Sequence, residues 1–239
     1  MSNKLNTKLI KKEEIAKDTL AITLEKQSDF NYSAGQSIDL TLSASDGSNL
    51  THTFSLITAP HEDNIAIATR VRDSQYKQTL KDLGEDSILS IEGPYGEFAL
   101  HQDVEKPAVF IVGGIGITPF LSLLRDAKNN KSPHKFYLFY SNRRPEDTTF
   151  LQELNDLDNS TDIDFTFIPT MTEFEATAKG WSGEQGYITW ELISRYIPAG
   201  VDAHYYMAGP QGMTTAMHKM LSENGVSEES MTSEQFPGY

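Results

Sequence analysis

The feature that most constrains the fold is a change of sequence pattern at Pro107. Before it, alternating or β-branched runs such as LAITLEK, QSIDLTLS and NIAIATRV are separated by turn-forming segments such as SDGSN and APHEDN. One helical segment, SQYKQTLKDLG, interrupts these runs, with Tyr76 and Leu80 at helical spacing and Gly84 as its stop. This pattern predicts an antiparallel β-barrel that carries a single helix.

After Pro107, apolar strand-like runs alternate with helical segments. AVFIVG is followed by ITPFLSLLRDAKN, HKFYLFYS by DTTFLQELNDL, and AHYYMAG by PQGMTTAMHKMLSENG. This alternation predicts an α/β domain with a doubly wound parallel sheet. The segment 101–107 between the two patterns is polar and ends in proline, so we expect a two-domain chain with one domain over residues 1–102 and the other over 103–239.

The composition excludes several classes of function. The chain has 34 Asp and Glu against 20 Lys and Arg, and this net charge of -14 argues against binding to nucleic acid or to an anionic membrane. It has no cysteine, so it supplies no thiolate ligand and we expect no metal site. No apolar run resembles a signal peptide or approaches the ~20 residues of a membrane span, so we expect a soluble, cytoplasmic protein. Any redox chemistry must come from a bound cofactor.

The segment VFIVGGIGITPF combines a strand-like run, three glycines and a helix start. Gly113, Gly114 and Gly116 allow a ligand phosphate to approach the amides of the following helix, and Pro119 suits its first turn. Tight packing between strand and helix requires small residues as well, so both interpretations stay open. The segment departs from the G-x-G-x-x-G dinucleotide pattern, since Pro119 stands at the third glycine position.

Several segments together resemble the ferredoxin-NADP reductase superfamily, in particular its compact bacterial members. They occur in one order over nearly the whole chain. The resemblance implies an FAD-binding β-barrel followed by an NAD(P)H-binding α/β domain, with hydride passing between the two cofactor rings. The segments are HTFSL, RVRDSQYK, GPYGEF, GGIGITPF, YSNRRPED, YYMAGPQGM and EQFPGY.

The family's flavin motif, R-x-Y-S, corresponds here to His52, Thr53, Phe54 and Ser55. The resemblance implies that Phe54 packs against the flavin, that Ser55 hydrogen-bonds near its reactive nitrogen, and that His52 takes the place of the phosphate-binding arginine. Histidine is a weaker phosphate anchor than arginine because it is neutral near pH 7. The alternative is that His52 and Phe54 are ordinary strand residues.

The resemblance also assigns the segment RVRDSQYK to the FAD pyrophosphate. Arg70 and Arg72 alternate with Val71, so we expect them to share a strand face, and Ser74 is expected to cap a helix with Lys77 one turn later. We expect Arg72 and Ser74 to bind the phosphates. A capped helix with surface arginines is the alternative.

In the second domain, the resemblance places the glycine segment and a later strand end around the nicotinamide dinucleotide. Many relatives have cysteine where this chain has Ala208, and hydride transfer does not require that thiol because the cofactors supply the chemistry. The residues expected to contact this cofactor are Gly114, Gly116, Ile117 and Thr118 in the first segment and Ala208, Gly209 and Pro210 in the second.

Two features of the sequence give opposite predictions for the coenzyme. Arg143 and Arg144 suit the 2′-phosphate of NADPH, whereas Glu173 follows the next strand and would repel that phosphate. The carboxylate favours NADH slightly. The resemblance also places Glu234, Phe236 and Tyr239 near the flavin or the nicotinamide pocket. It makes Phe236 or Tyr239 the gate over the flavin, and Glu234 a hydrogen-bond partner of the nicotinamide side or a proton relay. A frayed terminus is the alternative for this segment.

These features predict an oxidoreductase that passes hydride from NADH or NADPH to FAD and then single electrons to a separate acceptor, such as a ferredoxin or an oxygenase component. Ser55, Glu234 and Tyr239 are the expected catalytic residues. A diaphorase-like reductase of free flavin, iron complexes or quinones is one alternative. A flavin-free relative that acts as a binding or regulatory subunit is another, because the motif has lost its arginine and tyrosine. The sequence does not indicate an oligomeric state.

Overall fold

The computed structural model describes residues 3–44, 46–173, 181–198 and 200–236. The chain divides into two compact units. The first comprises residues Met1–Ala99 together with Thr118–Asp126, and the second comprises Leu100–Ile117 together with Ala127–Tyr239.

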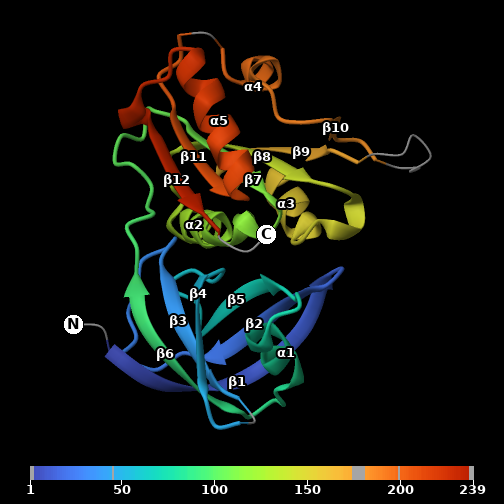
Figure 1. Cartoon of the computed structure of the whole chain (residues 1–239). Helices are drawn as coiled ribbons and strands as arrows, with labels where there is room; N and C mark the ends of the chain where they lie inside the picture. Colours follow the sequence, from blue (N-terminus) through green and yellow to red (C-terminus); the bar gives the residue numbers. More distant parts are fainter. Residues whose placement is uncertain (1–2, 45, 174–180, 199, 237–239) are drawn as a thin grey trace. The chain divides into compact units, whose positions relative to one another are not determined.

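The first unit contains a six-stranded antiparallel sheet in the order β4-β3-β6-β1-β2-β5 (Figure 1). A bridge between Leu56 and Ile67 brings the two outer strands together beyond the end of β4, which curls the sheet toward a barrel. The predicted barrel with one helix is therefore confirmed. Its elements are β1 (Asn3–Ala16), β2 (Thr19–Glu25), β3 (Ser37–Ser43), β4 (Asn49–Ser55), β5 (Asn64–Arg70), α1 (Gln75–Asp82) and β6 (Ile88–Tyr95).

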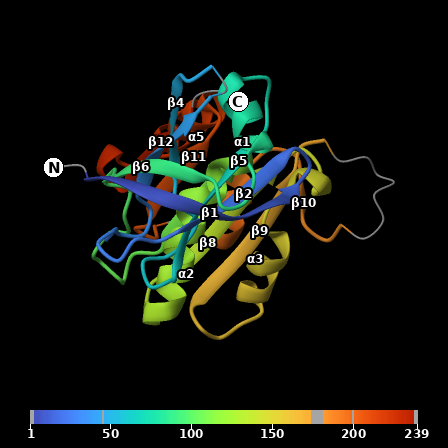
Figure 2. The same cartoon turned by 90° about the horizontal axis from the view of Figure 1, so that it is seen from below.

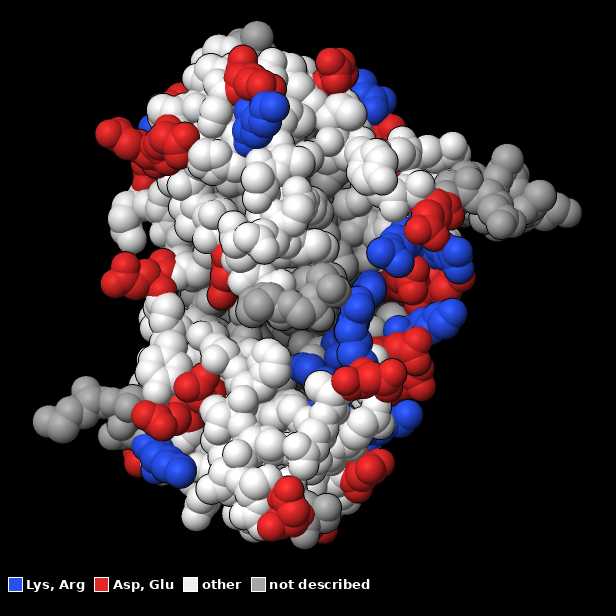
Figure 3. Space-filling model, in the orientation of Figure 1, with Lys and Arg blue, Asp and Glu red and all other residues white. Residues whose placement is uncertain are grey.

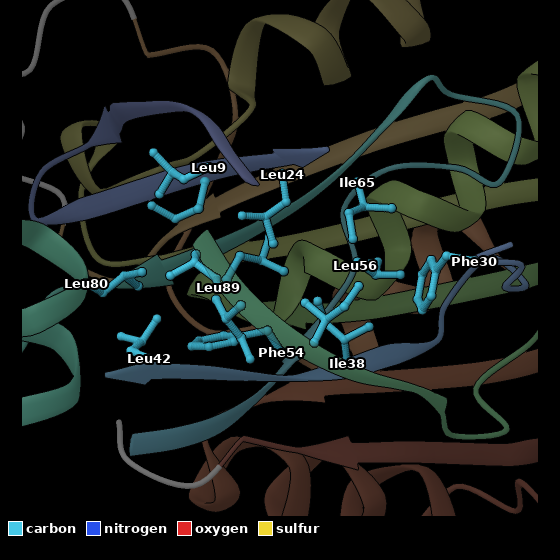
Figure 4. Packing of buried hydrophobic residues seen from close by; sticks show 14 of the residues in the cluster. Leu9, Leu24, Phe30, Ile38, Leu42, Phe54, Leu56, Ile65, Leu80 and Leu89 are labelled. Atoms are coloured by element: carbon cyan, nitrogen blue, oxygen red, sulfur yellow. The ribbon is translucent and has the colours of Figure 1, made fainter. Parts of the chain in front are cut away.

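The core of this unit is formed by the inward face of each strand. Figure 4 shows Leu42, Phe54 and Leu89 close together, with Leu80 of α1 beside them. Alternation of apolar and polar residues along each strand places one face in this core.

Strand β1 was not predicted from the sequence. Its lysines and glutamates obscure the alternation, but Thr7 and Leu9 are buried while Lys4, Asn6 and Lys8, at the alternate positions, are exposed. The strand pairs with both β2 and β6, so its backbone hydrogen bonds and two buried side chains stabilise it despite the polar composition.

The second unit is a parallel six-stranded sheet in the order β10-β9-β8-β7-β11-β12. Helix α3 lies beside β9 (Figure 2), and α4 and α5 cover the other face, as the doubly wound prediction requires. Helix α2 (Ile117–Asn130) is divided, since its residues Thr118–Asp126 belong to the first unit. The other elements of the second unit are β7 (Ala108–Gly113), η1 (Gly114–Gly116), β8 (Lys135–Asn142), η2 (Pro145–Asp147), α3 (Leu151–Asp158), β9 (Asp164–Met171), β10 (Glu184–Gln185), α4 (Trp190–Tyr196), β11 (His204–Gly209), α5 (Gln211–Glu223), η3 (Glu228–Ser230) and β12 (Met231–Gln235).

Candidate cofactor sites

Strand order in the second unit creates a switch point between β7 and β11. From β7 the chain continues to β8 on one side, whereas β11 pairs with β7 on the other side, and both pairings are parallel. In such sheets a crevice opens at the carboxyl ends of the two strands, where their connections diverge, and ligands bind there. The carboxyl ends here are Gly113 and Gly209.

Glycines at this switch point are required by the backbone itself. A Cβ on Gly116 would lie 2.5 Å from the Ala208 carbonyl oxygen and 2.8 Å from the Gly209 nitrogen. Gly209 has a φ of 153°, and a Cβ there would lie 3.2 Å from backbone atoms of Gly113. Tight packing between strand and helix start, the alternative left open by the sequence for the glycine segment, therefore explains Gly116, and the close approach of the two strand ends explains Gly209.

The start of α2 is suited to an anion. Gly114 has a φ of 53°, a conformation that favours glycine, and it directs the chain into the short helical turn before α2. The first turn of α2 contains no acidic side chain and no side-chain cap, and Thr118 within it is buried. Amides at a helix start lack intrahelical partners, so this end can bind a phosphate.

The strand β12 lies against the end of β11. Glu234 is in register with Ala208, and the Phe236 amide donates to the Gly209 carbonyl oxygen at 3.3 Å. The expected Glu234 and Phe236 are thus brought to the same strand end as Ala208 and Gly209, whereas Tyr239 lies outside the described residues. The frayed terminus is wrong as far as Phe236, because pairing with β11 holds the segment in the sheet.

Arg143, Arg144 and Glu173, which gave conflicting predictions for NADH or NADPH, form one cluster. Glu173 lies 3.1 Å from the Arg144 guanidinium and 3.8 Å from that of Arg143. The Glu173 amide also donates to the Arg143 carbonyl oxygen at 2.9 Å. These groups follow the carboxyl ends of β8 and β9, and the carboxylate offsets part of the positive charge of the arginines.

In the first unit, the flavin motif lies on β4 with its residues on alternating faces. His52 and Phe54 point to the core side, where their rings stack at 4.8 Å between centroids, and Phe54 is only 6% exposed. Thr53 points the other way and donates to Asp39 Oδ1 at 2.5 Å. Ser55 is buried at the strand end. Alternation along a strand explains why the two rings meet.

Helix α1 covers these rings with a lysine. The Lys77 ammonium lies 4.3 Å from the Phe54 ring centroid, and it also donates to Thr69 Oγ1. Burial lowers the pKa of Lys77 to about 8. Burial, and next the charge of Lys77, lower the pKa of His52, so the imidazole is neutral near pH 7. The sequence had indicated only that Lys77 lies near Ser74.

In the segment RVRDSQYK, the two arginines are arranged differently from the prediction. Strand β5 ends at Arg70, so the expectation that Arg70 and Arg72 share one strand face is wrong, because the chain has already left the sheet at Arg72. Arg72 is exposed. Ser74 caps α1 as predicted, since its Oγ accepts the Lys77 amide at 3.3 Å.

Two absences concern only the described residues. In these ranges no three or more His, Asp and Glu side chains are grouped so that they could hold a metal ion. None of the helices within the same ranges has the length and apolar character needed to span a bilayer.

Comparison with known protein families identifies both units. Residues 3–99 match a family model described as an FAD-binding domain, and residues 110–219 match one described as an oxidoreductase NAD-binding domain.

Individual relatives extend over much of the chain. The flavohemoprotein of Bacillus subtilis is 27% identical over 234 residues, which are 95% of this chain and 58% of that protein. The reductase component of propane 2-monooxygenase from Rhodococcus jostii is 29% identical over 150 residues, 62% of this chain and 40% of that protein. The chain therefore spans less than two thirds of these curated relatives.

Solved structures share the fold. A flavohemoglobin from Malassezia yamatoensis with bound FAD and heme superposes with a TM-score of 0.85 at 22% identity, covering 98% of this chain and 60% of that one. A ferredoxin NADP+ reductase from Neisseria gonorrhoeae with bound FAD and NADP gives a TM-score of 0.80 at 16% identity and covers 97% of this chain and 98% of that one.

Proposed function

Because the chain belongs to the ferredoxin-NADP reductase superfamily, with an FAD-binding and an oxidoreductase NAD-binding domain, we propose that it oxidises NADH and passes the electrons to a separate acceptor. Bound FAD supplies the conversion of a hydride into single electrons. The observation that supports this proposal most is the switch point between β7 and β11, where the start of α2 offers backbone amides to a dinucleotide phosphate.

For the first unit, the proposal rests on the match of residues 3–99 to an FAD-binding domain and on the cation of Lys77 beside the rings of Phe54 and His52. Arg70 at the end of β5 and the exposed Arg72 beyond it add positive charge to the same segment. In the proposal, His52, Thr53, Phe54 and Ser55 bind the flavin end, while Arg70, Arg72 and Ser74 bind the phosphates. These residues contribute to the rate mainly by fixing the flavin ring in position against the nicotinamide ring, because this positioning replaces a bimolecular encounter.

In the second unit, we assign the phosphates of the coenzyme to the start of α2. There Gly114, Gly116 and Thr118 present backbone amides, and Ala208, Gly209 and Pro210 flank the nicotinamide. Glu234 and Phe236 lie beside that strand end, where Glu234 can hydrogen-bond the carboxamide. Tyr239 keeps its proposed role as a gate.

The preference for NADH rests on the cluster of Arg143, Arg144 and Glu173. The ribose 2′-hydroxyl of NADH can donate to a carboxylate, whereas the 2′-phosphate of NADPH would have to displace Glu173 from both arginines and would be repelled by it.

We propose a ferredoxin or an oxygenase component as the acceptor. The absence of cysteine means that the chain holds no iron–sulfur cluster of its own, and one relative is named as the reductase component of a monooxygenase. On the face of the described residues drawn in Figure 3, basic and acidic side chains lie next to one another, so a partner must match a mixed pattern of charge.

The proposal is tested by mixing the FAD-loaded protein with NADH or NADPH without oxygen. We expect the flavin absorbance to bleach faster with NADH, and subsequent addition of an oxidised ferredoxin to restore the colour. Protein that is not bleached by either coenzyme contradicts the proposal. If colour returns only with free flavin, iron complexes or quinones, the diaphorase-like alternative is correct.

A further inference from the structure

Lys77 is a half-buried cation surrounded by uncharged groups. Its ammonium lies 4.3 Å from the Phe54 ring centroid and 5.6 Å from the Tyr76 ring centroid, and it donates to Thr69 Oγ1. Tyr76 is itself fixed, since its hydroxyl donates to the Leu40 carbonyl oxygen at 3.0 Å. The lysine is therefore held at this place by two rings and a hydroxyl.

Other lysines of the chain show what Lys77 lacks. Lys8 and Lys106 each lie 2.6 Å from a carboxylate oxygen, and hydrogen bonds to those carboxylates raise their pKa values. For Lys77 burial alone lowers the pKa, and it forms no ion pair with a carboxylate among the described residues. A buried ammonium without a counter-ion is unfavourable, so the site is completed by an incoming anion.

The surroundings of Lys77 indicate which anion this is. It lies in the FAD-binding domain, one turn into α1, whose first amides have no intrahelical partner and therefore favour a negative charge at the same end. His52, which stands where the family has arginine, is neutral because burial, and next the charge of Lys77, lower its pKa. The charged group beside the motif is thus the lysine and not the histidine.

We propose that the Lys77 ammonium binds the pyrophosphate of FAD and supplies the positive charge that the motif's histidine does not. This inference rests on the FAD-binding part of the proposed function and is independent of the coenzyme and of the electron acceptor. It also gives Thr69 a role, since its hydroxyl orients the ammonium toward the motif.

The experiment measures the dissociation constant of FAD from apoprotein by quenching of flavin fluorescence. We compare the wild type with Lys77→Met and Lys77→Arg, and with Lys81→Met as a matched control on an exposed position of the same helix. Loss of a charge-assisted hydrogen bond should weaken FAD binding roughly ten- to a hundredfold in Lys77→Met. Lys77→Arg should retain most of the affinity, and Lys81→Met should match the wild type.

Two further measurements separate a phosphate contact from a structural role. The wild-type affinity for FAD should fall as the pH rises through about 8, when the ammonium loses its proton, and Lys77→Met should show no such fall. Riboflavin, which has no phosphate, should bind the wild type and Lys77→Met equally. Circular dichroism of each apoprotein verifies that the variants are folded, and the wild-type pH profile needs no variant at all.

Several results overturn the inference. Equal FAD affinity of the wild type and Lys77→Met does so, as does a wild-type affinity that stays constant between about pH 7 and about pH 9. An equal loss of riboflavin and FAD in Lys77→Met would place the lysine on the flavin ring instead. A wild-type chain that binds no FAD would contradict the proposed function itself, which keeps the two failures distinct.

Discussion

The candidate cofactor sites of the two units are built from different groups, backbone in one and side chains in the other. In the second unit the switch point depends on backbone packed against backbone, with Gly116 next to Ala208 and Gly209 next to Gly113. In the first unit the site consists of side chains, the stacked rings of His52 and Phe54 with a lysine above them. Backbone packing leaves little freedom for substitution, whereas a side chain can be replaced by another that approaches from a different element.

This difference explains why one site is recognisable from its motif and the other departs from it. Gly116 cannot change without moving a neighbouring strand, so the glycine segment keeps the family pattern. A charge next to the flavin motif can come from β4 or from α1, so arginine can be lost from β4 when Lys77 is present.

The largest effect is expected from Gly116→Ala. Its Cβ would lie 2.5 Å from the Ala208 carbonyl oxygen, so the short helical turn before α2 must move away from the end of β11, at a free-energy cost of roughly 3 kcal/mol, the upper part of the range for overpacking. Reduction by NADH should fall about a hundredfold because the ring position shifts. Thermal unfolding and anaerobic stopped-flow kinetics measure both effects.

Two glycine controls calibrate this prediction. Gly212→Ala in α5 meets no atom within 4 Å and should be neutral or stabilising by up to about 1 kcal/mol, because alanine is the better helix former. Gly113→Ala meets first the Met213 sulfur at 2.4 Å, a side-chain atom that can move, and should be intermediate. If Gly116→Ala has the same thermal unfolding midpoint as Gly212→Ala, the switch point does not depend on backbone packing.

In the first unit, whose candidate site consists of side chains, the substitution Lys77→Met should stabilise the apoprotein, whereas Gly116→Ala destabilises it. The folded pKa of Lys77, about 8, is below the ordinary lysine value of 10.5, so the unfolded chain binds more protons between these values and wild-type stability rises with pH there. Below about pH 8 the wild type bears the full unfavourable charge, and Lys77→Met should be more stable by about 1–3 kcal/mol.

Denaturant unfolding at about pH 7 and about pH 10 tests this difference, which should shrink at the higher pH. Lys81→Met, at an exposed position, should leave stability unchanged at both pH values. Lower stability of apo Lys77→Met at about pH 7 would mean that the lysine contributes more by its contacts with Phe54 and Thr69 than its charge opposes.

Most of the fold follows from periodicity, and the misses have physical causes. Strands β7, β8, β9 and β11 and the helices that follow them were predicted because both faces of a parallel sheet are apolar. Strands β1, β10 and β12 were missed, since the polar side chains along them lack a strong apolar pattern.

The site shows the same limit. Glycines that permit close approach can be located from a sequence, whereas a ring covered by Lys77 cannot, because the contact joins α1 to β4 and depends on how the barrel closes. The pairing of Arg143 and Arg144 with Glu173 appeared in the sequence as two conflicting signals, and only the fold shows that they are one cluster.

A histidine cluster gives the second unit its own response to pH. His101 lies between the rings of His134 and His204, at 5.0 and 5.2 Å, and its Nδ1 hydrogen-bonds the Tyr206 hydroxyl at 2.9 Å. Burial, and next the charge of His101, lower the pKa values of His134 and His204; Lys106 lowers that of His204 further. Asp103 and Asp202 oppose these shifts without reversing them.

We expect this cluster to make the second unit acid-labile. Groups with lowered pKa values are neutral in the folded state while the unfolded chain takes up protons, so stability declines as the pH falls below about 6.5. The unfolding midpoint should drop on the order of 2–4 °C more in the wild type than in His204→Gln between about pH 7.5 and about pH 5.5. His61→Gln, at an exposed position, is the control, and an identical pH slope in all three proteins would contradict the role of the cluster.

A smaller effect is expected at the cluster of Arg143, Arg144 and Glu173, the part of the second unit's candidate site that consists of side chains. Glu173→Gln removes the carboxylate that neutralises Arg143 and Arg144, and the ratio of kcat/KM for NADPH to that for NADH should rise about fivefold. Steady-state kinetics with both coenzymes measure it. Glu228→Gln, which removes the carboxylate of an exposed pair with His218, should not alter the ratio. An unchanged ratio in Glu173→Gln would place coenzyme selection elsewhere.

Arg72→Ala should have the smallest effect and decides between two anchors for the same phosphate. Arg72 is exposed beyond the end of β5, where water and salt screen its charge, whereas Lys77 is half-buried beside the motif. FAD affinity of Arg72→Ala should fall only about two- to threefold, and this loss should vanish in high salt, while the loss in Lys77→Met persists. If Arg72→Ala weakens FAD binding as much as Lys77→Met, the exposed arginine is the principal anchor, and the first unit then binds its cofactor as its sequence alone predicted.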